Sequence, residues 1–170
     1  KIAVVIPAYR VTNHVADVIR GIPAWIKRIY VVDDGCPDQS GATAKAVDDP
    51  RVVVLHRVQN GGVGAAVKTG YRQAMADGFD IVVKMDGDDQ MDPAYLEPLL
   101  KPIATGHADY TKGNRFRDLK ALRQMPRVRL FGNSVLTFLV KAASGYWRMM
   151  DPTNGYTAIN RDALERMELD

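Results

Sequence analysis

DIVVKMDGDDQMDP, residues 80–93, runs from a Val/Ile-rich segment straight into four aspartates. A continuous run of such apolar residues is typical of a strand that is buried on both faces of a parallel sheet. Carboxylates crowded on one short loop repel each other unless a cation or ordered water offsets their charge. The stretch therefore predicts a buried strand whose carboxyl end carries an acidic loop, and it leaves open what balances the charge of that loop.

A divalent cation is one answer. Asp86 and Asp88 stand two residues apart, so on an extended loop both carboxylates point the same way, and Gln90 offers a neutral oxygen at the same spacing. Oxygen-only ligands favour Mg²⁺ or Mn²⁺, usually completed by substrate phosphates. An acidic, solvated turn that caps a helix beginning at Asp92–Pro93 explains the same residues. Both interpretations remain open on this stretch alone.

The rest of the chain repeats the pattern of strand followed by helix. Apolar runs predict strands at residues 1–7, 28–35, 51–58 and 79–86, and helical patterns lie at 13–21, 40–47 (with Ser40 as N-cap), 62–78 and 92–106 (with Pro93 in its first turn). This alternation predicts an α/β fold with a mostly parallel central sheet and helices on both faces. Ligands of such sheets bind at the carboxyl ends of the strands, where Asp33–Asp34 and Asp86–Asp88 both stand.

Composition sets the broad class. The 170 residues, 46% hydrophobic and 25% charged with a net charge of +3, fit one soluble globular domain over residues 1–170 and argue against disordered and fibrous classes. Cys36 is the single cysteine, which fits a reducing compartment. The opening residues predict a strand rather than a signal peptide, and no apolar run reaches membrane-spanning length. The chain lacks an initial Met and stops inside a charged helical pattern at 161–170, as expected of a domain truncated at its C-terminus.

Two further loops carry candidate binding residues. Asp33 and Asp34 follow the second predicted strand, where an acid accepts hydrogen bonds from a base N–H or a ribose hydroxyl; a helix-capping turn explains them equally well. The segment NGGVGAAVKTG, residues 60–70, contains Gly62 and Gly64 but has Val67 where a dinucleotide fingerprint needs a third small residue. It also follows the third strand rather than the first, which argues against a dinucleotide oxidoreductase. Its glycines instead allow a helix N-terminus to approach a ligand or the sheet.

The second half of the chain concentrates positive charge. Between Tyr110 and Leu130 there are seven basic residues against the single acid Asp118: Lys112, Arg115, Arg117, Lys120, Arg123, Arg127 and Arg129. Residues 130–147, LFGNSVLTFLVKAASGYW, follow with a helical pattern whose apolar face is wider than a core-facing stripe. That composition suits a helix lying in a membrane interface, and it equally suits a helix buried against the sheet or against a further part of the protein.

Six motifs occur together and in order, although each is weak alone. They are Pro7-Ala-Tyr9, VVDDGCPD (31–38), HRVQNGGVGAAVKTGY (56–71), DGDDQ (86–90), GNR (113–115) and DPTNGY (151–156). Over essentially the whole chain this set resembles the family 2 inverting glycosyltransferases, which have a GT-A fold. Within that family it is most similar to the polyprenyl-phosphate glycosyltransferases of the dolichol-phosphate mannose synthase type.

The resemblance implies roles for particular residues. Pro7 and Tyr9 would flank the nucleotide base, Asp33 or Asp34 would hydrogen-bond the base or ribose, and Asp86 would contact the nucleoside. Asp88 with Gln90, and Asp86 on the loop's own spacing, would hold Mg²⁺ or Mn²⁺ on the diphosphate. Gly62 and Lys68 of the glycine-rich segment would contact the nucleotide-sugar. Arg115, and less closely Arg129, would receive a lipid phosphate, and guanidinium forks suit phosphate oxygens.

The sequence departs from the family pattern at three positions. Arg10 and Val11 stand where the family often has Asn-Glu, so the base-side contacts differ from the family pattern and the nucleotide is not specified by it. Val63 replaces a Lys that is common in the glycine-rich loop.

The function implied is metal-dependent transfer of a sugar from a GDP- or UDP-sugar to a polyprenyl phosphate, by a hexosyltransferase at the cytoplasmic face of a membrane. Its catalytic residues would be Asp88, Arg115 and Asp151, with peripheral membrane contact and no nucleic-acid partner. A phosphate acceptor is already anionic at neutral pH, so Asp151 would shape the acceptor loop. In a glycosyltransferase that uses a sugar hydroxyl, Asp151 would be the base. A nucleotide-sugar-binding domain without turnover is a further alternative.

Overall fold

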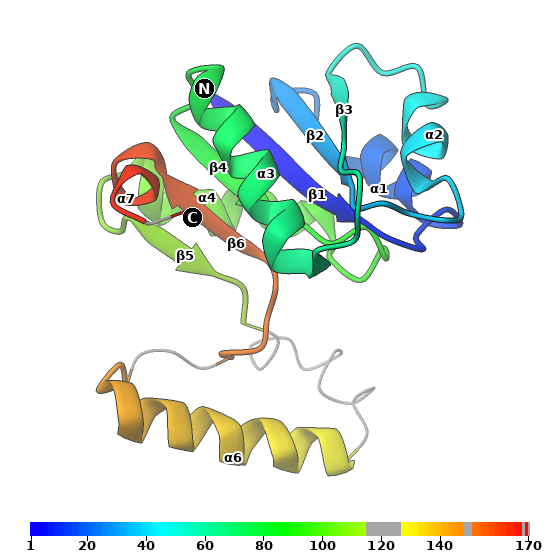
Figure 1. The fold of residues 1–170 in the computed structure, drawn as a ribbon. Helices are drawn as coiled ribbons and strands as arrows, with labels where there is room; N and C mark the ends of the chain where they lie inside the picture. The colour runs from blue at the N-terminus through cyan, green and yellow to red at the C-terminus, as the bar shows by residue number, and fades with distance from the viewer. Residues whose placement is uncertain (115–126, 148–150, 168, 170) are drawn as a thin grey trace. The chain divides into compact units, whose positions relative to one another are not determined.

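The structure is a computed structural model that describes residues 1–114, 127–147, 151–167 and 169 (Figure 1). The chain forms two compact units, one of residues 1–111 with 156–170 and one of residues 112–155. The elements in chain order are β1 (Ile2–Ala8), α1 (Val15–Gly21), β2 (Arg28–Asp33), α2 (Ser40–Lys45), β3 (Val52–His56), α3 (Gly62–Ala76), β4 (Ile81–Lys84), the 3₁₀ helix η1 (Pro93–Tyr95), α4 (Leu96–Ala104), β5 (Tyr110–Lys112), α6 (Arg127–Ser144), β6 (Thr157–Asn160) and α7 (Arg161–Glu165).

The six strands form one sheet in the order β3-β2-β1-β4-β6-β5. β1 pairs in parallel with β2 and with β4, and β2 pairs in parallel with β3, whereas β6 is antiparallel to β4. The four strands predicted from the sequence are therefore the parallel ones, and their carboxyl ends meet along one edge. The prediction of an α/β fold with a mostly parallel sheet is confirmed.

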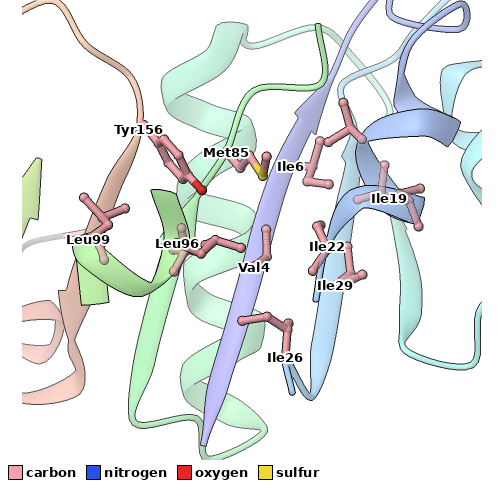
Figure 2. Packing of buried hydrophobic residues seen from close by; sticks show 14 of the residues in the cluster. Val4, Ile6, Ile19, Ile22, Ile26, Ile29, Met85, Leu96, Leu99 and Tyr156 are labelled. Atoms are coloured by element: carbon pink, nitrogen blue, oxygen red, sulfur yellow. The ribbon is translucent and has the colours of Figure 1, made fainter. Parts of the chain in front are cut away.

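The sheet is buried on both faces because its strands alternate apolar side chains between two cores. Val4 and Ile6 of β1 pack into the cluster that holds α1 and α4, and Figure 2 shows them beside Ile19, Ile29 and Leu96. Ala3 and Val5 of the same strand face the opposite cluster, which contains residues of α3 and α7. Each fully buried Val, Ile or Leu side chain contributes about 1.5–3 kcal/mol. The Val/Ile runs in the sequence are the direct consequence of this two-sided burial.

Helix α3 lies so close to the sheet that one position tolerates no side chain. A Cβ added at Gly70 would collide with Val5 Cγ1 and lie 2.9 Å from Val5 Cγ2 and 3.2 Å from Val32 Cγ2. Both valines are fully buried and β-branched, so neither side chain has room to turn away. Gly64, two turns earlier on the same helix, has nothing within 4 Å of an added Cβ.

We therefore expect the same substitution at these two glycines to have opposite effects on stability. Gly70→Ala should lower the free energy of unfolding by about 1–3 kcal/mol, because overpacking outweighs the helix propensity that alanine gains. Gly64→Ala should raise the free energy of unfolding by about 0.4–1 kcal/mol. Alanine lowers the conformational entropy of the unfolded chain and meets no steric conflict in the folded one. Urea unfolding of both variants measures the two changes, and a stable Gly70→Ala protein would contradict the close approach.

Several element ends differ from the sequence predictions. Ser40 is the first residue of α2 rather than its N-cap; Gln39 takes that place in a left-handed conformation with φ 63°. Pro93 begins a 3₁₀ turn, and the carboxylate of Asp92 caps it by accepting from the Ala94 N–H at 2.8 Å. The helix over residues 62–78 ends at Ala76, and Gly78 follows with φ 73°. β5 and β6 are additional strands, short and partly polar, without the Val/Ile runs that revealed the others.

The second unit contains α6, which covers most of the predicted helix at 130–147 and begins three residues earlier. Phe138 and Leu139 on this helix are more than half exposed, and Trp147 just beyond it is 62% exposed. Within the described residues, no helix combines the length and the apolarity that crossing a bilayer requires.

Candidate functional site

A pocket of about 290 Å³ lies where β1, β2 and β4 end and α3 begins. Ligand pockets commonly start near this volume. Twelve residues line it: Pro7, Ala8, Tyr9, Val11, Asp34, Asn60, Gly62, Val63, Ala66, Asp86, Gly87 and Asp88. The set includes six of the residues named from the sequence, drawn from four separate segments. Asp33, Lys68 and Gln90 were also named, and they do not line it.

The two aspartates at the end of β2 have different surroundings. Asp33 accepts a hydrogen bond from the Cys36 N–H at 2.8 Å and lies 3.5 Å from His56 Nδ1, so it holds its own loop together. Asp34 lines the pocket and is almost fully buried. It accepts from Arg57 Nε at 2.7 Å and from the Gly61 N–H at 3.1 Å. Of the pair, Asp34 is the one placed to meet a ligand in this pocket.

Gly35 allows the β2 loop to lie against the loop that precedes α3. Its φ of 64° belongs to the left-handed region that favours glycine. A Cβ at this position would lie 2.9 Å from the backbone nitrogen of Asn60, so a side chain would push the two loops apart. Asp34 and Asn60 both line the pocket. The two loops that carry them can lie this close together because residue 35 has no side chain.

The four aspartates of the acidic loop are not equivalent. Asp86 pairs with the ammonium of Lys84, whose side chain is only 11% exposed. Asp92 caps η1, and Asp89 is exposed with φ 61°. Asp88 lines the pocket and accepts a hydrogen bond from the Gln90 N–H at 3.2 Å. Asp86 and Asp92 thus already have partners within the fold. Asp88 is the carboxylate of this loop that lines the pocket without an ion pair to another described residue, so it is the best placed to meet a charged ligand.

The residues present fit a divalent cation that shares its ligands with a substrate. Asp86 and Asp88 line the same pocket, and both offer the hard oxygens that Mg²⁺ and Mn²⁺ prefer. Among the described residues, no three His, Cys, Asp or Glu side chains form a metal site by themselves. Two carboxylates are too few to hold such an ion tightly, whereas two carboxylates with a diphosphate are a usual set. Gln90 is exposed and contributes its backbone N–H rather than a pocket-lining side chain.

The N-terminus of α3 supplies positive partial charge to the same pocket. Gly62, Val63 and Ala66 from its first two turns line the cavity. The N-cap is Gly61, and the Gly62 N–H donates to Asn60 Oδ1 at 2.9 Å. Backbone N–H groups and the helix dipole favour an anion at such an end. The absence of a third fingerprint glycine is therefore no obstacle to phosphate binding. A helix N-terminus and two carboxylates that line one pocket suit a diphosphate together with a cation.

Tyr9 offers an aromatic ring beside the pocket, and its environment shows what replaces the family's Asn-Glu. The ring is 39% exposed, and the Arg10 guanidinium lies over it, 5.3 Å from the centroid. Arg10 adopts φ 57°, a conformation that Asn tolerates better, and its N–H donates to Cys36 Sγ at 2.9 Å. Val11 makes that edge of the pocket apolar.

The candidate acceptor residues lie in the second unit or outside the described residues. Arg115 is outside them, as is the side chain of Arg129 on α6. Asp151 is described: it accepts a hydrogen bond from Thr153 Oγ1 at 3.2 Å, and its carbonyl accepts from the Asn154 N–H at 3.3 Å. Lys112 Nζ donates to the carbonyl of Pro152 at 2.7 Å. The DPTNGY segment is therefore a turn tied to the strand that ends at Lys112.

Residues that sequence reasoning missed are mainly small or apolar. Ala8, Ala66 and Gly87 line the pocket without chemistry that a sequence would reveal, and Val11 and Val63 stand out in the sequence only as departures from the family pattern. Asn60 sits directly before the glycine pair, and that position at a helix start was the available hint. Lys84 precedes Asp86 by two residues. Because side chains alternate along a strand, Lys84 and Asp86 lie on the same face and can pair.

Comparison with known proteins agrees with this geometry. The sequence model of Glycosyl transferase family 2 matches residues 3–167. Polyprenol monophosphomannose synthase of Mycolicibacterium smegmatis is 33% identical over 177 residues, covering 98% of this chain and 64% of that protein. Undecaprenyl-phosphate mannosyltransferase of Micrococcus luteus is 35% identical over 150 residues, covering 84% of this chain and 58% of that protein.

A solved structure supports the fold. Mannosyl-3-phosphoglycerate synthase from Rubrobacter xylanophilus superposes with a TM-score of 0.71 at 18% identity, covering 96% of this chain and 54% of the other. The chain thus spans roughly half to two thirds of the length of these three proteins. The family predicted from the six motifs, and with it the GT-A fold, is confirmed. This chain belongs to glycosyl transferase family 2.

Proposed function

We propose that this chain is the catalytic domain of a metal-dependent inverting glycosyltransferase that moves a sugar from a nucleotide-sugar to a polyprenyl phosphate. One observation carries the proposal: Tyr9, Asp34 and Asp88 line a single pocket at the N-terminus of α3. An aromatic face, a buried hydrogen-bond acceptor and a carboxylate near a helix N-terminus are three features that suit a nucleoside diphosphate with its cation. The assignment of Asp34 rather than Asp33 to the nucleoside is part of the proposal.

In the donor complex, the base stacks on Tyr9 and the nucleoside donates a hydrogen bond to Asp34. The diphosphate lies toward the first N–H groups of α3, near Gly62. Asp86 and Asp88 would hold Mg²⁺ or Mn²⁺, which supplies neutralisation of the charge on the departing diphosphate. Lys84 keeps Asp86 in place and reduces the repulsion between the two carboxylates. Lys68 lies two residues beyond Ala66 on α3 and does not line the pocket, so a donor contact from it is assigned on the family resemblance alone.

The transfer step needs no general base if the acceptor is a phosphate. A phosphate oxygen forms a bond to the anomeric carbon from the face opposite the leaving group, and the bond from that carbon to the diphosphate oxygen breaks. The electron pair leaves with the nucleoside diphosphate, and the configuration inverts. A phosphate monoester with a second pKa near 6 is already anionic at neutral pH. Asp151, held in its turn by Thr153, would then shape the acceptor loop.

The acceptor class rests on three observations. Two relatives are named for transfer to polyprenol or undecaprenyl phosphate. Seven basic residues between positions 110 and 130 suit a phosphate. Four described apolar side chains of α6 are exposed, and so is Trp147 just beyond the helix, which suits a helix lying in the interface of a membrane. The four are Val135, Leu136, Phe138 and Leu139. We infer peripheral contact with the cytoplasmic face, where nucleotide-sugars are available.

The test is a transfer assay with a panel of radiolabelled GDP- and UDP-sugars and short polyprenyl phosphates, with Mn²⁺ or Mg²⁺. Labelled lipid product with one donor supports the proposal. Labelled oligosaccharide without lipid product would instead favour a hydroxyl acceptor, with Asp151 as base. Donor binding without either product or hydrolysis would favour a nucleotide-sugar-binding domain.

Replacing Tyr9 with alanine should raise the KM for the donor and leave the KM for the acceptor nearly unchanged. Loss of a base-stacking ring costs about 1–3 kcal/mol at single-stranded nucleic-acid sites, and a similar loss is expected here. Steady-state kinetics with each substrate varied in turn measures the effect. Tyr95→Ala is the matched control, since Tyr95 is also exposed but does not line the pocket. A change confined to the acceptor KM would show that Tyr9 is misassigned.

A further inference from the structure

Arg57 does not line the pocket, but it joins the end of β2, where the pocket-lining Asp34 lies, to the first half of α3. Its Nε donates to Asp34 Oδ1 at 2.7 Å, at the end of β2. Its Nη1 donates to Thr69 Oγ1 at 2.8 Å and to the Ala65 carbonyl at 3.2 Å, both in the first half of α3. Gly61, which starts α3, donates its N–H to the same Asp34 carboxylate. One guanidinium therefore fixes a strand end to a helix start.

The loop before α3 is shaped around this guanidinium. A Cβ added at Gly61 would lie 2.6 Å from Arg57 Nη2 and 2.8 Å from Ala65 Cβ, so Arg57 occupies the space that a side chain would need. The Arg57 N–H also donates to the Asp33 carbonyl at 2.9 Å, which fixes the main chain from which the side chain starts. The planar fork donates in several fixed directions at once, and a lysine ammonium has no equivalent.

These contacts orient the one buried carboxylate of the pocket. The side chain of Asp34 is 3% exposed, so its charge depends on Arg57 for compensation. Asp34 Oδ1 accepts hydrogen bonds from both Arg57 and Gly61. Within the described residues, Oδ2 accepts from the Gly61 N–H alone, at 3.2 Å. The carboxylate is thus held with Oδ2 as the oxygen that has capacity to accept another hydrogen bond.

We propose that Arg57 is a positioning residue for the donor, which orients Asp34 and the N-terminus of α3 so that both meet the same nucleoside diphosphate. The inference rests on the proposed function, because it supposes that the pocket binds a nucleotide. Arg57 contacts no part of the pocket cavity itself, so its influence on binding passes through Asp34 and the α3 loop.

The chain provides a matched control in Arg51. Its side chain is 21% exposed against 28% for Arg57, and it also pairs with an aspartate, Asp49, at 2.7 Å. It donates further to the carbonyls of Ile22 and Pro23, so it ties elements together just as Arg57 does. None of its partners lines the pocket. A residue that serves the fold alone should behave like Arg51.

The experiment measures the dissociation constants of GDP and UDP with Mn²⁺ by calorimetry, together with the melting temperature, for wild type and for variants of Arg57, Asp34 and Arg51. Arg57→Met should weaken binding of the preferred nucleotide by about tenfold or more, since a charged hydrogen-bonding partner of a buried group is lost. Arg57→Lys should recover part of the affinity through the charge. Arg51→Met should lower the melting temperature without changing the dissociation constant more than about twofold.

A double-mutant cycle tests whether Arg57 acts through Asp34. If it does, Arg57→Met added to Asp34→Asn should weaken binding by less than about threefold further. Equal effects of Arg57→Met in both backgrounds, or a dissociation constant unchanged by Arg57→Met, would overturn the inference. The Lys variant answers the question if the Met variant does not fold. Failure of wild type to bind either nucleotide would refute the proposed function instead, so the two failures are distinguishable.

Discussion

Asp88→Asn is expected to abolish sugar transfer and to weaken binding of the nucleotide diphosphate. The substitution keeps the size of the side chain and removes one negative charge from the pocket edge where the cation and the diphosphate are proposed to meet. Removing an electrostatic group of this kind typically costs about 10²–10³ in kcat. Nucleotide affinity should lose its dependence on Mn²⁺ at the same time, and calorimetry with and without the ion measures this separately from turnover.

Asp89→Asn is the matched control for Asp88→Asn. It removes the same charge one residue away, but Asp89 is exposed and does not line the pocket. Its φ of 61° also lies in a region that asparagine tolerates well, so the fold should not suffer. Activity close to wild type is expected. Equal loss in both variants would indicate a general effect of loop charge, and full wild-type activity in excess chelator would remove the metal from the proposal.

Arg115→Ala is expected to damage use of the acceptor far more than binding of the donor. The expectation rests on the family resemblance of GNR and on the excess of basic residues around it, since Arg115 lies outside the described residues. Loss of one charged hydrogen-bonding group costs about 1.5–3 kcal/mol, which should appear as a higher KM for polyprenyl phosphate. Arg115→Lys should recover only part, because a planar fork suits phosphate oxygens and an ammonium does not form one.

Asp151→Asn supplies the internal control for the acceptor. A phosphate acceptor needs no proton removed, so this variant should retain substantial turnover. A sugar hydroxyl needs a base, and the same variant would then be inactive. Complete loss of turnover in Asp151→Asn, combined with unchanged acceptor kinetics in Arg115→Ala, would establish the hydroxyl acceptor as the better assignment.

The parallel part of the fold was predictable because its strands are buried on both faces and so consist of uninterrupted apolar runs. β6 gave no such signal: it is four residues long and antiparallel, and its sequence TAIN includes polar residues. The N-cap of α2 was misplaced because Gln39 reaches the left-handed region, which its residue type does not announce. Short polar strands and unusual dihedral angles are decided by tertiary contacts, and a single sequence does not display them.

Within the site, the sequence identified the carboxylates but not their division of labour. Asp33 and Asp34 are adjacent and chemically identical, so the sequence does not distinguish their roles. In the structure, Asp33 bonds within its own loop, whereas Asp34 lines the pocket. Likewise, the pairing of Asp86 with Lys84 follows from strand alternation, yet the acidic loop looked like four equal charges. Which groups are already paired within the fold is a property of three-dimensional packing.

The connection between β5 and β6 has a consequence for how such enzymes diversify. Residues 112–155 leave the sheet at one strand and return at its neighbour, and Asn160 Nδ2 donates to Asp109 Oδ1 at 2.7 Å where these strands are joined. Doubling the length of a connection between two paired strands costs only about 0.6 kcal/mol of loop-closure free energy, so a change in the length of residues 112–155 need not disrupt the sheet. The segment can therefore be exchanged between family members. A chimaera that carries the segment of another member corresponding to residues 112–155 should keep the nucleotide preference of this chain and take on the acceptor specificity of the protein that donated the segment.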